Sequence, residues 1–351
     1  MLVGINYPWV DYGWDFGDPP SAWVAPGNAP AWREEKRRKI DEDFRAFADL
    51  GISAVRWFIL ADGASYGTDA EAPRLVDNKW RFDPLPREHS FHRQLREDFE
   101  YVLQACAKYQ MQFVPSLIDF HWCYPGTQME GNAGIVKGGR GEIVTDPRKR
   151  EAFFAAVLDP LLELSLRYHE QIFAWELINE PEWVIRKWSP LFWRRDKNRT
   201  IPRDRMLEFI VEGIRRINAC ELPDEMPAFR STVGFAHFET LDEWDSSGLG
   251  IALHQYHYYA QNEDPIPSHR TSAHQPCFVG ELATAVQKEW PELESRQLPQ
   301  TISQRLQWLE RKEYPAAFLW SARAIDVATS WSPNDHQQTL AYLRSPGSDV
   351  A

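Results

Sequence analysis

The chain has 351 residues, of which 43% are hydrophobic, and a formal net charge of −12 at pH 7. This length permits two domains or one α/β barrel with insertions, and in both cases a large buried core. The negative charge argues against nucleic acid and against an anionic membrane surface as partners, because both repel an acidic protein.

The first residues already have the pattern of a strand, at Leu2–Asn6, and no basic and apolar leader precedes them. No apolar run reaches the roughly 18 residues that a membrane span needs. We therefore expect a cytoplasmic protein without a membrane partner, or a secreted protein whose signal peptide has been removed.

Strand-like and helix-like segments alternate along the whole chain, which is the pattern of parallel βα units. The expected strands are Leu2–Tyr7, Ala54–Ile59, Gln112–Leu117, Ile172–Ile178, Ala228–Val233, Gly250–Tyr256, Cys277–Glu281 and Ala316–Trp320. The expected helices are Glu34–Leu50, His92–Tyr109, Pro147–His169, Arg203–Cys220, Pro299–Lys312 and Asp335–Leu343. Two connections are less regular, since only Glu239–Trp244 looks helical after the fifth strand and Ala260–Gln275 is polar and turn-rich.

Eight βα units predict an α/β fold, a single (β/α)8 TIM barrel formed by residues 1–351. The long irregular stretches all follow strand ends, so we expect them on the C-terminal face, where barrel enzymes build their sites. These stretches are Trp9–Ala31, Ala61–Ser90, Cys123–Thr145 and Glu182–Pro202. The chain has 16 Trp, 12 Tyr and 19 Phe, and several Trp fall in these loops. There they suit the faces of sugar rings, or else they pack the loops against the barrel.

Two of the expected strands end on a glutamate, Glu180 in Trp175–Pro181 and Glu281 in Phe278–Glu281. A carboxylate at the end of a buried strand is costly unless it is paired or used. In a barrel these two strand ends converge on one face. Two facing carboxyl groups are the minimum equipment for cleaving a glycosidic bond.

Glu180 directly follows Asn179, although neighbouring side chains on a regular strand point to opposite faces. For both to reach one site, the strand must bulge or end there, and Pro181 gives it a reason to stop. We interpret Glu180 as a general acid, kept protonated by burial and by a second carboxylate nearby. The alternative is a Glu that caps the next segment or pairs with an Arg.

Glu281 follows a glycine, which allows close approach of neighbouring groups. As a nucleophile it must stay ionised and therefore needs cationic or hydrogen-bonding neighbours. Arg56 lies inside the apolar run Ala54–Phe58, and a buried Arg is almost always paired with a carboxylate. We expect it to anchor Glu281, with a purely structural ion pair as the alternative.

Histidines lie near two further strand ends. His121 follows the third strand, and the sixth strand contains His254 and Tyr256 on one face. We favour this pair as the one in the barrel mouth, and His257 with Tyr259 on the other face is the alternative. A zinc site from His121, His254 and His257 is disfavoured because the HxH or HExxH spacing is missing. We expect no metal and no cofactor, since no phosphate loop, nucleophile elbow or dinucleotide fingerprint occurs.

The eighth strand ends at Trp320, which would provide either a floor for a sugar ring or a plug for the barrel. At this point the chain resembles the retaining (β/α)8 glycoside hydrolases, and most of all glycoside hydrolase family 5. The resemblance implies that Glu180 is the acid/base and Glu281 the nucleophile. It also implies that Arg56 holds the nucleophile, that Asn179 contacts the sugar 2-hydroxyl, and that His121, His254 with Tyr256, and Trp320 line the site.

The resemblance further implies double displacement on a β-linked carbohydrate. Long loops that wall off one end of the site, and the lack of a visible secretion signal, favour an exo-acting enzyme for oligosaccharides. An endo-acting β-glucanase or mannanase with an open groove is the alternative, and a non-catalytic carbohydrate-binding barrel is a third reading. The sugar, the linkage and the oligomeric state stay open at this stage.

Overall fold

The computed structural model describes residues 1–10, 13–19, 21, 23–67, 71–129, 134–186, 196–220, 228–238, 241, 244, 248–259, 276–283, 301–323 and 333–344. Its centre is a closed barrel of parallel strands in the order β1-β12-β11-β10-β9-β8-β5-β2. The strands are β1 (Leu2–Asn6), β2 (Ala54–Phe58), β5 (Gln112–Asp119), β8 (Trp175–Asn179), β9 (Ser231–Phe235), β10 (His254–Tyr258), β11 (Cys277–Ala283) and β12 (Ala316–Trp320). The predicted (β/α)8 barrel is confirmed.

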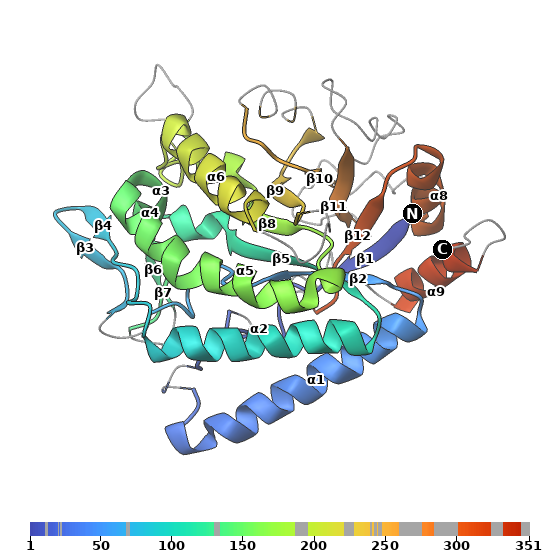
Figure 1. Ribbon diagram of the computed structural model, residues 1–351, viewed down its shortest axis with the longest axis horizontal. Helices are drawn as coiled ribbons and strands as arrows, with labels where there is room; N and C mark the ends of the chain where they lie inside the picture. Colours follow the sequence, from blue (N-terminus) through green and yellow to red (C-terminus); the bar gives the residue numbers. More distant parts are fainter. Residues whose placement is uncertain are drawn as a thin grey trace.

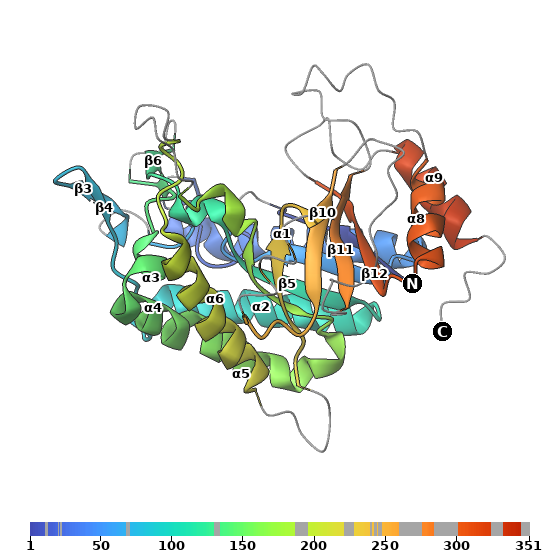
Figure 2. The ribbon, with the colours of Figure 1, turned by 90° about the horizontal axis from the view of Figure 1, so that it is seen from above.

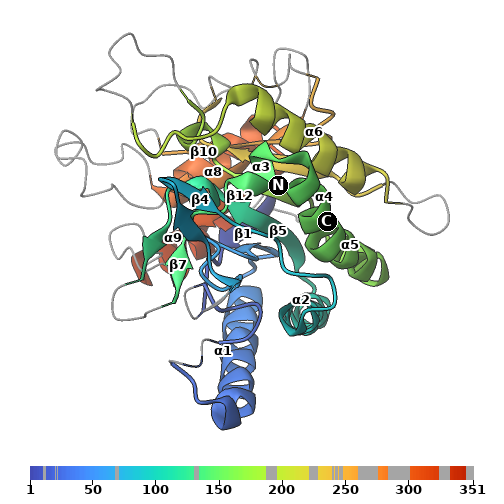
Figure 3. The same cartoon turned by 90° about the vertical axis from the view of Figure 1, so that its left-hand side faces the viewer.

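Helices form a layer around the strands, as Figures 1 and 3 show. They are α1 (Ala29–Asp49), α2 (Ser90–Lys108), α3 (Glu142–Thr145), α4 (Pro147–Phe153), α5 (Asp159–Ser165), α6 (Arg203–Asn218), α8 (Ile302–Arg311) and α9 (Pro333–Leu343). The helix expected at Pro147–His169 is present, but a π turn at Phe154–Leu158 separates α4 from α5. None of the helices in these described ranges is long and apolar enough to cross a membrane.

Each of the predicted strands exists, but the fourth, fifth and sixth begin later than expected, the fourth (β8) at Trp175 instead of Ile172. β9 starts at Ser231 instead of Ala228, and β10 starts at His254 instead of Gly250. Gly250 has a φ of +71°, which belongs to a turn and not to a strand. The expected helix Glu239–Trp244 is described only at Leu241 and Trp244, and Ala260–Gln275 lies outside the described residues.

Two of the loops at the C-terminal ends of the strands contain small sheets that the sequence did not predict. β3 (Arg74–Val76) and β4 (Lys79–Arg81) form a hairpin between β2 and α2. β6 (Thr127–Gln128) pairs with β7 (Val136–Lys137) in the loop that follows β5. Figures 1 and 2 show the β3–β4 hairpin projecting at one end of the molecule, the end toward which β5 points.

The barrel interior is apolar at the N-terminal ends of the strands and polar toward their C-terminal ends. The apolar part consists of Ala54, Val114, Phe173, Ala174, Leu253, Phe278, Ala316 and Phe318. The Phe173, Phe278 and Phe318 rings pack with centroids 5.4 to 6.1 Å apart. Further along the same strands the buried residues include Arg56, Glu176 and Glu281. Charged groups at this depth need partners, which directs attention to the C-terminal half of the barrel.

Candidate active site

Both predicted glutamates lie at irregular points of their strands. On β8, Glu176 pairs with Thr232 but Asn179 pairs with Gly234, so β8 has one residue more than β9 between these points. This bulge turns Glu176 and Asn179 to the same side, and β8 ends at Asn179, directly before Glu180, as the alternative of a strand end predicted. On β11, an extra residue between Val279 and Leu282 likewise shifts the register with β12. Bulges of this kind re-aim side chains next to active sites.

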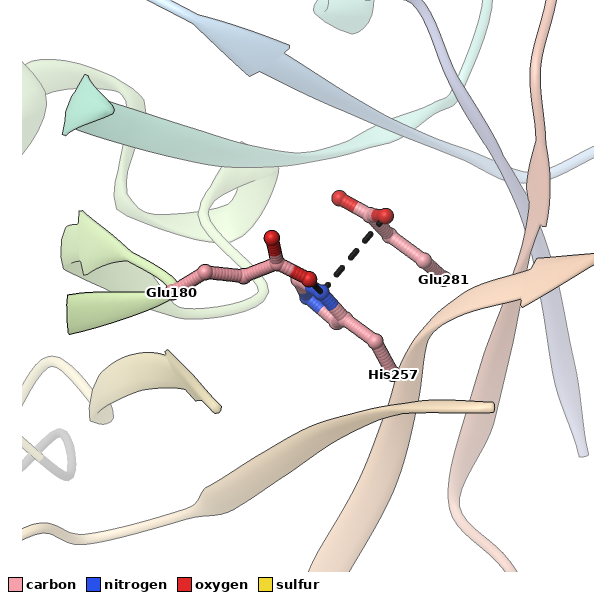
Figure 4. Close-up of side chains that lie close together, drawn as sticks. All are labelled: Glu180, His257 and Glu281. Atoms are coloured by element: carbon pink, nitrogen blue, oxygen red, sulfur yellow. Dashed lines mark hydrogen bonds and ion pairs between the residues drawn. The ribbon is translucent and has the colours of Figure 1, made fainter. Parts of the chain in front are cut away.

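Glu180 and Glu281 converge on the ring of His257, as Figure 4 shows. His257 Nδ1 lies 2.7 Å from Oε1 of Glu180 and 3.5 Å from Oε2 of Glu281. One ligand atom from each of these three residues lies within 4.8 Å of the other two, so an oxygen of Glu180 and an oxygen of Glu281 are at most 4.8 Å apart. The predicted convergence of the two strand ends is confirmed.

Arg56 contacts Glu281, as predicted, but it also binds a carboxylate that the sequence interpretation overlooked. Its Nη1 donates to Oε1 of Glu281 at 2.8 Å. Its Nε and Nη2 donate to the two oxygens of Glu176 at 2.6 and 2.7 Å. Glu176 also accepts from Ser116 Oγ and Gln255 Nε2. One buried cation therefore serves two buried carboxylates.

Asn179 lies between Arg56 and a second overlooked residue, Asp119. Asn179 Oδ1 accepts from Arg56 Nη2 at 2.7 Å, and its Nδ2 donates to Asp119 Oδ2 at 2.7 Å. The other oxygen of Asp119 accepts from the backbone N–H of His121 at 2.9 Å and from its ring Nδ1. The side chain of His121 is half exposed. Asp119 thus holds two of the predicted site residues at once.

The preferred register of the sixth strand was wrong. Tyr256 OH lies 2.7 Å from Tyr314 OH, and Tyr314 closely follows α8, so Tyr256 points to the helical layer. His254 shares that face of β10 and is buried. The alternative pair lies in the site instead, where Tyr259 OH donates to Glu281 Oε2 at 2.6 Å. Because β10 runs on to Tyr258, its C-terminal end falls at His257 and Tyr259.

Trp320 lies at the C-terminal end of β12 and is half-buried. Its ring centroid is 6.4 Å from that of Phe58, and the ring of Trp9 stacks on Phe58 with centroids 6.3 Å apart. These three aromatic residues come from the ends of β12, β2 and β1. The Phe58 ring lies 5.0 Å from the Arg56 guanidinium, so this aromatic group adjoins the buried cation, and the sugar platform expected at Trp320 stays a prediction.

Two glycines allow the polar groups to pack this closely. A Cβ on Gly280 would lie 2.5 Å from the Gln255 side chain. A Cβ on Gly234 would lie 2.7 Å from both Gln255 Nε2 and Glu176 Oε1. Gln255 can therefore reach Glu176 only because both neighbouring strands have no side chain at these points.

The surroundings give the two glutamates different proton affinities. Burial, and next the charge of Asp119, raise the pKa of Glu180 to about 7. Burial also raises the pKa of Glu281, but His257, Arg56 and the Tyr259 hydroxyl oppose this rise. Burial lowers the pKa of His257 to about 4, so its ring is neutral near pH 7. Near neutral pH Glu180 can therefore hold a proton, whereas Arg56 and the Tyr259 hydroxyl favour the charged form of Glu281.

Within the described ranges, Glu180, His257 and Glu281 are the one group of His, Cys, Asp or Glu side chains close enough to share an ion. The zinc alternative from His121, His254 and His257 does not correspond to this group, because His254 lies on the other face of β10. The atoms of the group already bond to one another, to Arg56 and to Tyr259. We therefore interpret it as a hydrogen-bonded acid–base pair with a histidine between.

The closed barrel thus has Glu180 directly after its fourth strand, β8, and Glu281 within its seventh strand, β11. No protein-family model matches the sequence, and no curated protein is significantly similar to it. The fold matches solved structures over nearly the full chain, so the resemblance to family 5 enzymes is confirmed at the level of the fold.

The β-mannanase of the blue mussel Mytilus edulis matches with a TM-score of 0.66 at 16% identity, covering 99% of this chain and 92% of the mussel chain. An endo-1,4-β-mannanase of Eisenia fetida matches at 0.65 and 18%, covering 99% and 91%. A Bacteroidetes-affiliated family 5 cellulase matches at 0.52 and 12%, covering 99% and 93%. The structural neighbours of this chain are thus glycoside hydrolases.

The Arg56–Glu176 pair leads to a prediction about stability. Glu176→Ala leaves the buried guanidinium with one carboxylate instead of two, and we expect it to lower the free energy of unfolding by about 3–5 kcal/mol. Urea denaturation followed by Trp fluorescence measures the change.

Glu42→Ala is the control, because it removes an i,i+4 pair with Arg38 on the exposed face of α1. We expect almost no effect from it, since exposed pairs contribute little. Equal losses for the two variants would contradict the importance of the buried pair.

Proposed function

We propose that this protein is a retaining β-glycoside hydrolase that cleaves internal bonds of a β-1,4-mannan-type polysaccharide. The observation that carries the proposal is the short separation of the carboxyl groups, since one oxygen of Glu180 lies within 4.8 Å of one oxygen of Glu281. Retaining enzymes have carboxyl groups about 5–5.5 Å apart, whereas inverting enzymes need about 6.5–9.5 Å to admit a water.

The mechanism follows from the different surroundings of the two glutamates. Glu281, held by Arg56 and Tyr259, attacks the anomeric carbon while the glycosidic bond breaks. Glu180 gives its proton to the leaving oxygen. In the second step Glu180 takes a proton from water, and this water releases the sugar from Glu281 with net retention.

The substrate class rests on the comparisons. The sequence favoured an exo-acting enzyme for oligosaccharides, but the structural neighbours named above support the endo-acting alternative better. One of them is an endo-1,4-β-mannanase and another is a β-mannanase. We therefore propose mannan as the substrate and internal cleavage as the mode.

Product analysis on β-1,4-mannan tests the substrate and the mode together. We expect the viscosity of galactomannan to fall early and mixed oligosaccharides to appear before mannose, and we expect cellulose derivatives to be cleaved more slowly. Mannose released alone from the outset would restore the exo reading. If no β-glycoside is cleaved, the non-catalytic carbohydrate-binding barrel becomes the better reading.

The roles of the glutamates lead to a rescue prediction. We expect Glu281→Ala to abolish turnover of an activated aryl β-glycoside and azide to restore part of it, with an α-glycosyl azide as product. Azide fits the space of the missing carboxylate and attacks from the same side. An α-azide from Glu180→Ala instead, identified by NMR, would reverse the two roles.

The pKa values lead to a prediction for the pH dependence. Activity requires a protonated Glu180, so kcat/KM should fall as the pH rises through about 7, the pKa of that carboxyl. It should also fall at acidic pH, where Glu281 becomes protonated. Glu180→Gln should remove the alkaline limb for a substrate whose leaving group needs no proton. A limb that persists in this variant would mean that another group sets it.

A further inference from the structure

The backbone at Glu180 has an unusual conformation. Glu180 adopts a left-handed conformation with φ +45° and ψ +53°, which is strained for a residue with a side chain. Its N–H donates to the carbonyl of Gly234 at 2.6 Å. A single 3-10 turn, Pro181–Trp183, follows at once. This turn brings the indole of Trp183 back to the carboxyl group three residues before it.

The contact between the two side chains is direct. Trp183 Nε1 donates to Oε2 of Glu180 at 2.9 Å, while Oε1 faces His257. An indole N–H can only donate, so this hydrogen bond has one possible direction. Both oxygens of the carboxyl group therefore have a fixed neighbour.

The indole ring is itself held in place. The guanidinium of Arg199 lies 5.9 Å from the ring centroid, and the ring of His237 lies 5.7 Å away at its edge. Arg199 Nη1 donates to the carbonyl of Glu182 at 2.7 Å, so the cation is anchored to the same turn. A ring fixed on two sides can transmit its position to the carboxyl group that it contacts.

We propose that Trp183 is a positioning residue for the acid/base carboxyl group: its indole N–H fixes Oε2 of Glu180 through both proton transfers of the double displacement. The proposal rests on the proposed function, because it assigns Glu180 the acid/base role. Trp183 does not react and acts only through Glu180. Its effect should be largest in the second step, where Glu180 is ionised and accepts the hydrogen bond most strongly.

The hydrogen bond has a defined electrostatic sign. Burial and Asp119 raise the pKa of Glu180, and the Trp183 N–H opposes them because it favours the charged form. The other charged or titratable groups facing Glu180 are Asp119 from β5, His121 and Tyr124 after β5, Arg56 from β2, His237 after β9, His257 and Tyr259 at the end of β10, and Glu281 from β11. None of these groups changes when the indole N–H alone is removed.

Trp183→Phe removes the N–H and keeps a ring between Arg199 and His237. We expect the apparent pKa of the alkaline limb of the kcat/KM profile to increase by about one pH unit, because the ionised Glu180 loses one hydrogen bond. For a dinitrophenyl glycoside, whose leaving group needs no acid, we expect kcat to fall about tenfold with kcat/KM nearly unchanged. Trp183→His, which retains a ring N–H, should recover part of kcat. Trp308→Phe, the same change on α8, should leave the profile unchanged.

A merely structural role for Trp183 would lower all parameters together and leave the pH limb in place, and that result would overturn the proposal. If Trp183→Phe does not fold, the indole N–H resonance of the wild type decides. It should titrate together with Glu180 and stop titrating in Glu180→Gln, whereas a resonance insensitive to pH would overturn the contact. This NMR test needs no turnover, so it stays separate from a failure of the proposed glycosidase activity.

Discussion

The arrangement of this site depends on one buried cation. The guanidinium of Arg56 is 1% exposed and donates to groups from three neighbouring or facing strands: Asn6 on β1, Glu176 and Asn179 on β8, and Glu281 on β11. Removing a charge from water costs several kcal/mol unless its partners replace the lost hydration. These side chains are therefore stable only as a set, and the set joins opposite sides of the barrel.

The same set makes two identical side chains chemically different. Glu281 shares Arg56 with Glu176 and accepts from Tyr259, whereas Glu180 has no direct hydrogen bond to Arg56 among the described contacts and faces the charge of Asp119. Burial acts on both carboxyl groups in the same direction. The two carboxyl groups differ because the cation Arg56 bonds directly to Glu281, whereas the anion Asp119 raises the pKa of Glu180.

The barrel, both glutamates and Arg56 could be predicted from the sequence, because a charged residue within or at the end of an apolar run stands out in the sequence pattern alone. Glu176 carries the same signal inside Trp175–Asn179 and could have been found by the rule that identified Arg56. The face of β10 could not be predicted in this way. It depends on where the strand begins after the turn at Gly250 and on the bulge at Gly280, and neither follows from alternation alone.

The bulges in β8 and β11 and the aromatic residues at the strand ends belong to different parts of the barrel. The gap between the carboxyl groups is set by backbone irregularities inside the barrel, fixed by Gly234, Gly280 and the hydrogen bonds of Arg56. Trp9 and Trp320, which both contact Phe58, lie instead after β1 and at the end of β12. Under the proposed function, loop changes could therefore alter which sugar is accepted while the distance between the two carboxyl groups stays the same.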